Sequence, residues 1–375
     1  MMSYNIAVVP LDGVGKEIHP LAVKLLKMTE EAIGGFELEM QWYEAGVEYA
    51  CKTGRGMPDG FYDDMRNADA MFCGSPGHFD LEKAKTDYPE YRIGMIARFF
   101  RAGMNNGIGL RPLTLMPGVD TPLKKVEKID AFLVRELTEG GYNTPGHSCC
   151  NDNVCYDVQM VTRVCGEKLA HTAYGIAKNR NGRLQDGKKM VTLAIKTGAV
   201  GILDFYHKIF REIAPQYADV VETQYLGIDT LCEQLIKAPE RFDVVVCENM
   251  CGDIVGDIGA CLTGGMGIAP TADIGGITPH FRPNHGTFPR AAGKNIANPI
   301  AAFMTAGLML EILANDHNDD ALRAGSKLIR RSIENYLVSG RSRTYDLGGS
   351  AGTDEAANAV FESLKIVSKT SGSLN

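Results

Sequence analysis

The chain has 375 residues, 45% of them hydrophobic and 23% charged, which is the composition of a globular protein of two or three domains. Its formal net charge of -7 provides no overall basic surface and argues against a nucleic acid or a membrane surface as partner. No apolar run approaches the roughly 20 residues of a membrane span, and no signal-peptide pattern opens the chain, so we expect a cytoplasmic protein.

Strands and helices alternate along the chain. The expected strands are short apolar segments, most of which end in polar residues: 6–10, 68–74, 129–136, 190–196 and 242–249. The expected helices have apolar residues at helical spacing: 16–32, 83–104, 299–315 and 320–338. This alternation predicts an α/β fold with a largely parallel sheet, and we expect the tail from residue 368 to be disordered.

The usual glycine-rich phosphate loops are absent. The chain contains no GxGxxG at its first strand, no GxxxxGK[ST], no HExxH and no GxSxG, so a Rossmann crevice is not expected. In open α/β sheets, ligands collect beyond the carboxyl ends of strands. That rule directs attention to Arg135, Lys196, Glu248 and Asn249.

The ten cysteines are scattered, and we expect reduced thiols rather than a disulfide framework. Cys149, Cys150, Cys155 and Cys165 lie near His147, but their spacing fits no common zinc pattern. We therefore interpret them as ordinary thiols.

Asp253 and Asp257 are the strongest local signal for chemistry. They follow the strand at 242–249, and a helix would place both carboxylates on one face. A divalent cation or an arginine between them would relieve their repulsion, and oxygen ligands favour Mg²⁺ or Mn²⁺. The alternative is a pair of solvated acids, which the glycine-rich LTGGMGIAP that follows makes less favourable.

The segment ENMCGDIVGDIGACLTGGMGIAP resembles the signature of the isocitrate and 3-isopropylmalate dehydrogenases, the β-decarboxylating dehydrogenases. Five further segments follow that family's order: AVVPLDGVGKE, GLRP, VRELTEGGY, HGTFPRAAGKNIANP and RTYDLGGSAGTDE. The resemblance covers nearly the whole chain. It implies the isopropylmalate-dehydrogenase-like fold, with two interleaved α/β domains around a mixed sheet.

The resemblance implies a domain on the cofactor side, formed by residues 1–106 and 264–375. Residues 107–263 would form the substrate and dimerisation domain, with a protruding arm near 140–165. It also implies an obligate homodimer with shared active sites, and the choice between dimer and tetramer stays open.

The resemblance also implies the site residues. Arg101, Arg111 and Arg135 would hold the malate core of the substrate, because guanidinium groups bind carboxylates bidentately. The metal would be bound by Asp253 and Asp257, together with Asp229 from the other subunit.

Lys196 and Asp229 would remove the hydroxyl proton of the substrate, and both would come from the partner chain. Burial near the cation would lower the pKa of Lys196. Tyr142 matches the tyrosine that protonates the enol.

The cofactor is expected along five residues of one segment, next to the opening turn: His285, Gly286, Thr287, Arg290 and Asn298. The family's NAD users carry an aspartate where this chain has Arg290. An arginine would pair with a 2′-phosphate, so we favour NADP over NAD. The alternative is an exposed Arg290 that contacts nothing.

Arg98 is expected to determine the substrate specificity. It precedes Arg101 by three residues, so a helix would place both on one face. Isopropylmalate enzymes carry a leucine there and homoisocitrate enzymes an arginine, which favours a third acidic group on the substrate. The alternative is an Arg98 that points to solvent.

Six positions depart from the family pattern, namely Leu11, Lys16, Gly198, Cys251, Arg282 and Asn284. They suggest an unusual anionic substrate, such as a phosphonate, or unusual cofactor handling.

We therefore predict an NAD(P)-dependent oxidative decarboxylase of an isocitrate- or homoisocitrate-like acid. The alternatives are a 3-isopropylmalate, malate or tartrate dehydrogenase, and a non-catalytic regulatory subunit.

Overall fold

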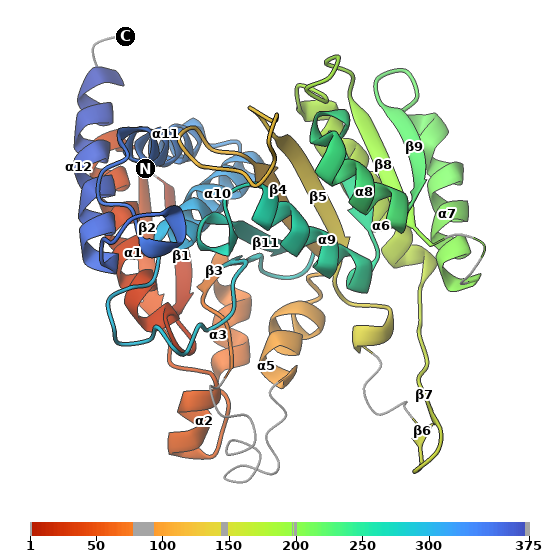
Figure 1. The fold of residues 1–375 in the computed structure, drawn as a ribbon. Helices are drawn as coiled ribbons and strands as arrows, with labels where there is room; N and C mark the ends of the chain where they lie inside the picture. Colours follow the sequence, from red (N-terminus) through yellow and green to blue (C-terminus); the bar gives the residue numbers. More distant parts are fainter. Residues whose placement is uncertain (1, 78–93, 144–148, 197, 199–200, 372–375) are drawn as a thin grey trace.

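The computed structural model describes residues 2–77, 94–143, 149–196, 198 and 201–371, which form an α/β fold around a ten-stranded sheet (Figure 1). The strand order is β2-β1-β3-β12-β11-β4-β5-β10-β8-β9. The strands of this sheet are β1 (Met2–Val9), β2 (Phe36–Trp42), β3 (Ala70–Cys73), β4 (Ile108–Thr114), β5 (Asp130–Glu136), β8 (Met190–Ile195), β9 (Glu222–Gly227), β10 (Val244–Cys247), β11 (Pro270–Ile274) and β12 (His280–Pro283).

The sheet consists of two parallel blocks joined by an antiparallel centre. One block is β2, β1, β3 and β12, and the other is β5, β10, β8 and β9. Between them β11 pairs antiparallel with β12 and β4, and β4 pairs antiparallel with β5. Because three antiparallel pairings separate the blocks, the blocks run in opposite directions.

Helices cover both faces of the sheet. The helices are α1 (Gly15–Ile33), α2 (Val47–Thr53), α3 (Phe61–Asn67), α5 (Gly94–Arg98), α6 (Arg163–Asn179), α7 (Gly201–Ile213), α8 (Ile228–Lys237), α9 (Asn249–Leu262), α10 (Ile300–His317), α11 (Asp320–Ser339) and α12 (Thr353–Ser371). One face packs in a single large core against α1, α6, α7, α10, α11 and α12.

The other face carries two smaller cores. Strands β1 and β3 pack there against α3, α5 and the π-helical turn Phe99–Gly103. Strands β5, β8 and β10 pack against α8 and α9. Alternation along the strands separates the faces, since Ile6 and Val8 enter the large core while Ala7 and Val9 enter a smaller one. The centre of the sheet, between the two smaller cores, is where polar groups gather.

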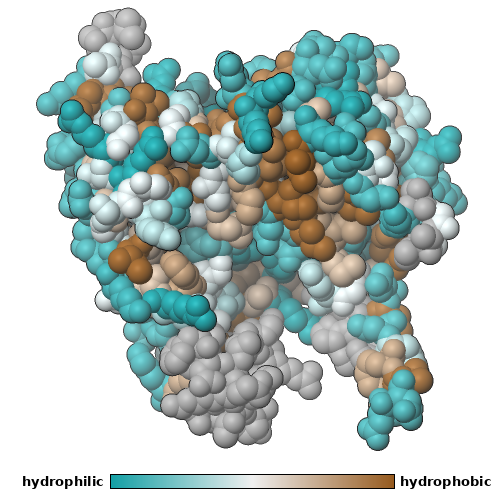
Figure 2. Space-filling view, viewed as in Figure 1, coloured by the Kyte–Doolittle hydropathy of each residue, from teal (hydrophilic) through white to brown (hydrophobic). Residues whose placement is uncertain are grey.

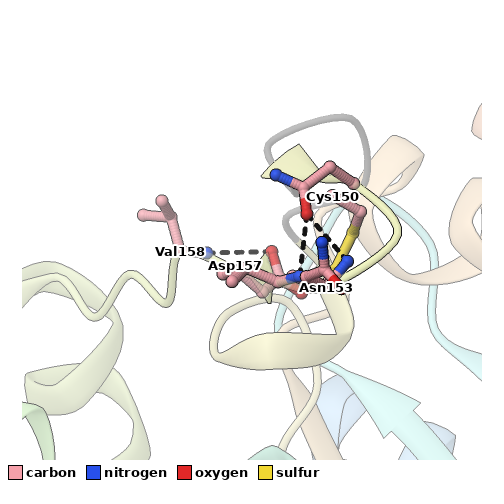
Figure 3. Close-up of a disulfide and its surroundings, with 7 residues drawn as sticks. Cys150, Asn153, Asp157 and Val158 are labelled. Carbon is pink, nitrogen blue, oxygen red and sulfur yellow. Dashed lines mark hydrogen bonds between the residues drawn. A yellow bond between two sulfur atoms is a disulfide. The ribbon is translucent and has the colours of Figure 1, made fainter.

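A two-stranded hairpin of β6 (Cys149–Cys150) and β7 (Cys155–Tyr156) projects from the body of the protein (Figure 1). A disulfide joins Cys150 to Cys155 across it (Figure 3). The Asn151 side chain accepts hydrogen bonds from the backbone nitrogens of Asn153 and Val154 at 2.9 and 2.8 Å, which closes the turn. The expectation of reduced thiols is therefore wrong for this pair of cysteines.

The structure confirms the predicted α/β fold with its mixed, largely parallel sheet. The expected strands are found as β1, β3, β5, β8 and β10, and three expected helices as α1, α10 and α11. Of the helix expected at 83–104, residues 83–93 lie outside the described part, and the chain is helical from Gly94 to Gly103. The disorder expected from residue 368 is wrong as far as Ser371, where α12 ends.

The two predicted domains correspond to two halves of the sheet. Strands from residues 107–263 occupy the half from β4 to β9, and the remaining strands occupy the other half. The sheet is continuous across both, and the domain division stays a prediction. Among the described helices, none is both long and apolar enough to span a membrane.

Candidate active site

Three ionisable side chains lie in one row across the centre of the sheet. The register pairs Arg135 of β5 with Gly109 of β4, Gly109 with Asp273 of β11, and Asp273 with His280 of β12. Paired residues on neighbouring strands point to the same face, so these polar side chains gather between the two smaller cores. All three side chains are buried, and Asp273 is completely enclosed.

Helix α9 brings two acids onto this row. The carboxylate of Asp253 accepts a hydrogen bond from Arg111 Nη2 at 3.1 Å and another from Arg135 Nη1. Asp257 Oδ1 lies 3.9 Å from Arg111 Nη1. The predicted placement of both acids on one helix face is confirmed.

The charges of this group shift one another's pKa. Burial alone would raise the pKa of Asp253, but the neighbouring Arg135 and Arg111 outweigh it and hold that pKa below its usual value. Burial, together with the nearby Arg111 and Arg101, lowers the pKa of Arg135 to about 10. Both shifts leave Asp253 and Arg135 charged at neutral pH, beneath α9.

Two glycines of α9 allow this close approach. A Cβ at position 252 would meet the side chain of Arg135, with Cγ 2.7 Å away, and one at position 256 would overlap the guanidinium of Arg111. Gly252 and Gly256 are therefore part of the site, because only a helix face without side chains fits against two buried arginines. Neither glycine is among the predicted site residues, although their spacing of four in GDIVGDIG places both on one helix face.

Lys196 and Asp229 pair with each other in the same chain. Lys196 follows β8, Asp229 opens α8, and Nζ lies 3.1 Å from Oδ2. A hydrogen bond from Lys196 lowers the pKa of Asp229. Both side chains are exposed, and the expected burial of Lys196 is not seen in the single chain. Tyr142 is also exposed, with its ring 6.0 Å from the guanidinium carbon of Arg135.

Asp253 and Asp257 have the oxygen ligands that a hard divalent cation prefers, but two acids are too few to complete a metal site. Asp253 and Asp257 offer partly exposed oxygens, which suit Mg²⁺ or Mn²⁺. In the part of a single chain that the structure describes, however, no three acidic, histidine or cysteine side chains come together as ligands. A metal here would need a donor from outside these residues.

The predicted cofactor segment touches the opening turn. The backbone nitrogen of Val14 donates to the carbonyl of Thr287 at 3.0 Å, and Ser75 Oγ donates to the carbonyl of His285 at 2.7 Å. A Cβ at Gly13 would overlap the Thr287 carbonyl, so this contact requires glycine. Leu11, where the family has glycine, takes a left-handed φ of 57° that is costly for a branched side chain.

The other residues of the cofactor segment differ in exposure. Gly286 and Arg290 are exposed. Asn298 is buried, donates to Asp346 Oδ2 at 2.9 Å and accepts from the backbone nitrogen of Ile300 at 3.0 Å. The Asn298 side chain thus already stabilises the start of α10.

Arg101 and Arg98 do not line the same cavity. Arg101 lies in the π-helical turn, 3.4 Å from Asp273 through Nε, and lines a cavity together with Ala97. Arg98 is exposed and is not among the residues that line this cavity. The arrangement matches the alternative of an Arg98 that points to solvent, while its role in substrate binding stays a prediction.

Comparison with known proteins identifies the family of the chain. Residues 5–360 match the family described as isocitrate/isopropylmalate dehydrogenase. The chain is 32% identical to the decarboxylating D-malate dehydrogenase of Escherichia coli, over 96% of this chain and 98% of that protein. It is 31% identical to the tartrate dehydrogenase/decarboxylase of Pseudomonas putida, over 96% and 98%. The crystal structure of isocitrate dehydrogenase from Methylococcus capsulatus superimposes with a TM-score of 0.82, at 28% identity, covering 96% of this chain and 99% of that one.

The fold and the site define the class of NAD(P)-dependent β-decarboxylating dehydrogenases. The chain belongs to the isocitrate/isopropylmalate dehydrogenase family, as its sequence predicted. Members of this family act on hydroxy acids and generally use a divalent metal and NAD(P).

Proposed function

We propose that this enzyme oxidises and decarboxylates a 2-hydroxy acid of the isocitrate or homoisocitrate type. The observation that carries the proposal is the meeting of Arg111 and Arg135 with Asp253 beneath α9. Buried guanidinium groups beside a carboxylate with partly exposed oxygens suit a ligand that carries both acid groups and a bound cation.

The residues have distinct roles in this proposal. Arg101, Arg111 and Arg135 bind the carboxylates of the malate core. Asp253 and Asp257 would hold Mg²⁺ or Mn²⁺ with Asp229 of a second copy, as the oxygen-only donors suggest. When bound, the cation would polarise the 2-oxo group during loss of CO₂, and the nicotinamide would take up the hydride.

Proton movements fall to Lys196, Asp229 and Tyr142. The 3.1 Å contact of Lys196 with Asp229 allows this pair to accept the hydroxyl proton of the substrate and pass it on. Tyr142, beside Arg135, donates a proton to the carbon that loses CO₂. We assign the dinucleotide to His285, Gly286, Thr287, Arg290 and Asn298, with NADP favoured by the exposed cation of Arg290.

We infer that two copies form each site. One chain offers two acids for a metal, while its Lys196–Asp229 pair is exposed. Hydrophobic side chains gather on the surface over α9 and its neighbours (Figure 2), and Met250 and Ile254 on α9 are 45% and 56% exposed. The hairpin arm adds exposed Val154 and Tyr156. Exposed apolar groups at two places suit an interface with a second copy.

The test is nicotinamide reduction at 340 nm with Mg²⁺ or Mn²⁺, with NAD and NADP in parallel. The substrates are isocitrate, homoisocitrate, 3-isopropylmalate, D-malate, tartrate and a phosphonate analogue. We expect turnover that EDTA abolishes, with CO₂ released in step with reduced cofactor. Turnover of isopropylmalate, malate or tartrate alone would replace the proposed substrate but keep the reaction. No turnover of any of them, with bound ligand still detectable, would favour a regulatory subunit.

A further inference from the structure

Arg282 belongs to a buried charged cluster that the predicted site does not include. Its Nε lies 3.7 Å from Asp273 Oδ2, and the same oxygen lies 3.4 Å from Arg101 Nε and 3.3 Å from His280 Nδ1. Asp273 is completely buried, and the Arg282 side chain is 14% exposed. His280 and Arg282 are two apart on β12, so they share a face of the sheet.

The cluster has more positive than negative charge. Asp273 is the one carboxylate within ion-pair distance of Arg101 or Arg282 among the described residues, so one carboxylate serves two guanidinium groups. The neighbouring Asp253 is already engaged by two other arginines. Burial and the nearby charge of Arg101 lower the pKa of Arg282 to about 10, although Asp273 opposes this. Burying two guanidinium groups that share one carboxylate raises the free energy of the folded protein, unless a further anion binds beside them.

A cavity lies where that anion would bind. It has a volume of about 210 Å³ and is lined by Arg101, Arg282, Ala97, Phe100, Asn284 and His285, among others. Asn284, which lines the cavity, donates through Nδ2 to Asp257 Oδ1 at 3.5 Å and so connects the cavity to the proposed metal acids. His285, in the segment assigned to the cofactor, also lines the cavity. A group in the cavity therefore lies next to residues of both proposed sites.

We propose that Arg282, together with Arg101, binds an additional anionic group, a carboxylate or phosphonate, carried on C3 of the hydroxy acid. This rests on the proposed function and deepens it, since Arg282 selects the substrate in the place predicted for Arg98. Guanidinium groups suit either anion because they donate paired hydrogen bonds. Asp273 acts as a positioning residue that holds both arginines at the cavity wall.

The test compares Arg282→Gln with the wild type by isothermal titration in the presence of Mn²⁺. The ligands are isocitrate, with a third anionic group, D-malate, without one, and a malate that carries a phosphonomethyl group on C3. The wild type should prefer either isocitrate or the phosphonate ligand. We expect Arg282→Gln to bind the preferred one about 10- to 100-fold more weakly, because a charged hydrogen-bond partner is lost. Binding of D-malate should change less than about threefold. KM values of the same ligands should follow the same pattern.

Two further variants separate loss of the anion contact from general damage to the protein. Arg282→Lys preserves the charge without the fork and should recover part of the lost affinity, which also covers the case in which Arg282→Gln fails to fold. Arg241→Gln is the matched control, since Arg241 is an exposed arginine bound to Gln234, far along the chain from this cluster.

Several results would overturn the proposal. Equal losses for D-malate and for the ligands with three anionic groups would give Arg282 a structural role. A changed KM for the dinucleotide alone would assign Arg282 to the cofactor. Selective loss in Arg98→Gln with none in Arg282→Gln would restore the role predicted for Arg98. Selective binding without turnover of any hydroxy acid would support the anion site while the proposed function fails.

Discussion

Gly256 of α9 lies directly against the guanidinium of Arg111 of β4, so closely that a Cβ at position 256 would overlap Nη1. Four residues earlier, Gly252 lies against the aliphatic part of the Arg135 side chain, where a Cβ would come within 2.7 Å of Cγ. The acids that follow each glycine, Asp253 and Asp257, are thereby brought within reach of the arginines. The glycine face of α9 thus sets the distance between these two acids and the buried arginines.

Gly256→Ala is expected to displace Arg111 and impair substrate binding. The added methyl group has no room, so we expect KM to rise about tenfold and the free energy of unfolding to fall by about 1–3 kcal/mol. Steady-state kinetics and urea denaturation measure the two effects. The control is Gly175→Ala on α6, where a Cβ meets nothing within 4 Å. Gly175→Ala should keep full activity. If Gly256→Ala instead keeps the wild-type KM, Arg111 is not a substrate ligand.

Mixing inactive variants tests whether sites are shared between subunits. If Lys196 and Asp229 of one chain complete the site of another, Lys196→Met mixed with Asp253→Asn should regain activity in mixed dimers. Random pairing leaves half the dimers mixed, each with one intact site, so recovery should reach about one quarter of the wild type.

The matched control for this experiment is a mixture of Lys196→Met with Asp229→Asn. These two residues form one ion pair within a chain, so every site of a mixed dimer keeps one defect and no activity should return. Recovery in this control, or none in the first mixture, would contradict sharing of the site.

Arg290→Asp tests the assignment of the cofactor. An exposed guanidinium can pair with a 2′-phosphate, whereas a carboxylate repels it and can accept from a ribose hydroxyl. We expect the ratio of kcat/KM for NADP to that for NAD to fall about 10- to 100-fold. Arg66→Asp on α3 replaces another exposed arginine and should leave the ratio unchanged. An unaltered ratio in Arg290→Asp would leave Arg290 without a role in cofactor choice.

His19 makes stability depend on pH below neutrality. It is completely buried in α1, its Nδ1 is 3.0 Å from the Gly15 carbonyl, and burial lowers its pKa to about 4. The unfolded chain takes up a proton near pH 6.5, whereas the folded chain does not until about pH 4. The contribution of neutral His19 is therefore complete above pH 6.5 and is lost as the pH falls toward 4, by up to about 3 kcal/mol.

The check is urea denaturation of His19→Gln between pH 7 and pH 4. The variant should lose less stability over that range than the wild type, because glutamine does not titrate. His171→Gln, which replaces an exposed imidazole, is the control for removing a histidine that is not buried. Equal slopes in all three proteins would exclude His19 as the cause.

Five of the ten strands of the sheet were predictable from local pattern. The apolar segments that became β1, β3, β5, β8 and β10 are continuous and bounded by polar residues, and burial on both faces favours such segments. Strands β2, β4, β9, β11 and β12 were not predicted. Of these, β11 and β12 are the shortest. They pair with each other as a local antiparallel hairpin, but the antiparallel pairing of β11 with β4 at the centre of the sheet joins distant parts of the chain.

The sequence by itself determined the family, the α/β fold and the helical face shared by Asp253 and Asp257, because motifs in order and spacing along one helix are local information. Only the tertiary structure revealed that Arg282, rather than Arg98, joins Arg101 at the cavity. The reason is physical. A π-helical turn begins just after Arg98, so the regular helical spacing no longer predicts which side chains share a face. The hairpin register of β11 and β12 brings Asp273 and His280 together, with Arg282 two residues further along the same strand face. The long-range pairing of β11 with β4 and of β12 with β3 then places this hairpin at the centre of the sheet.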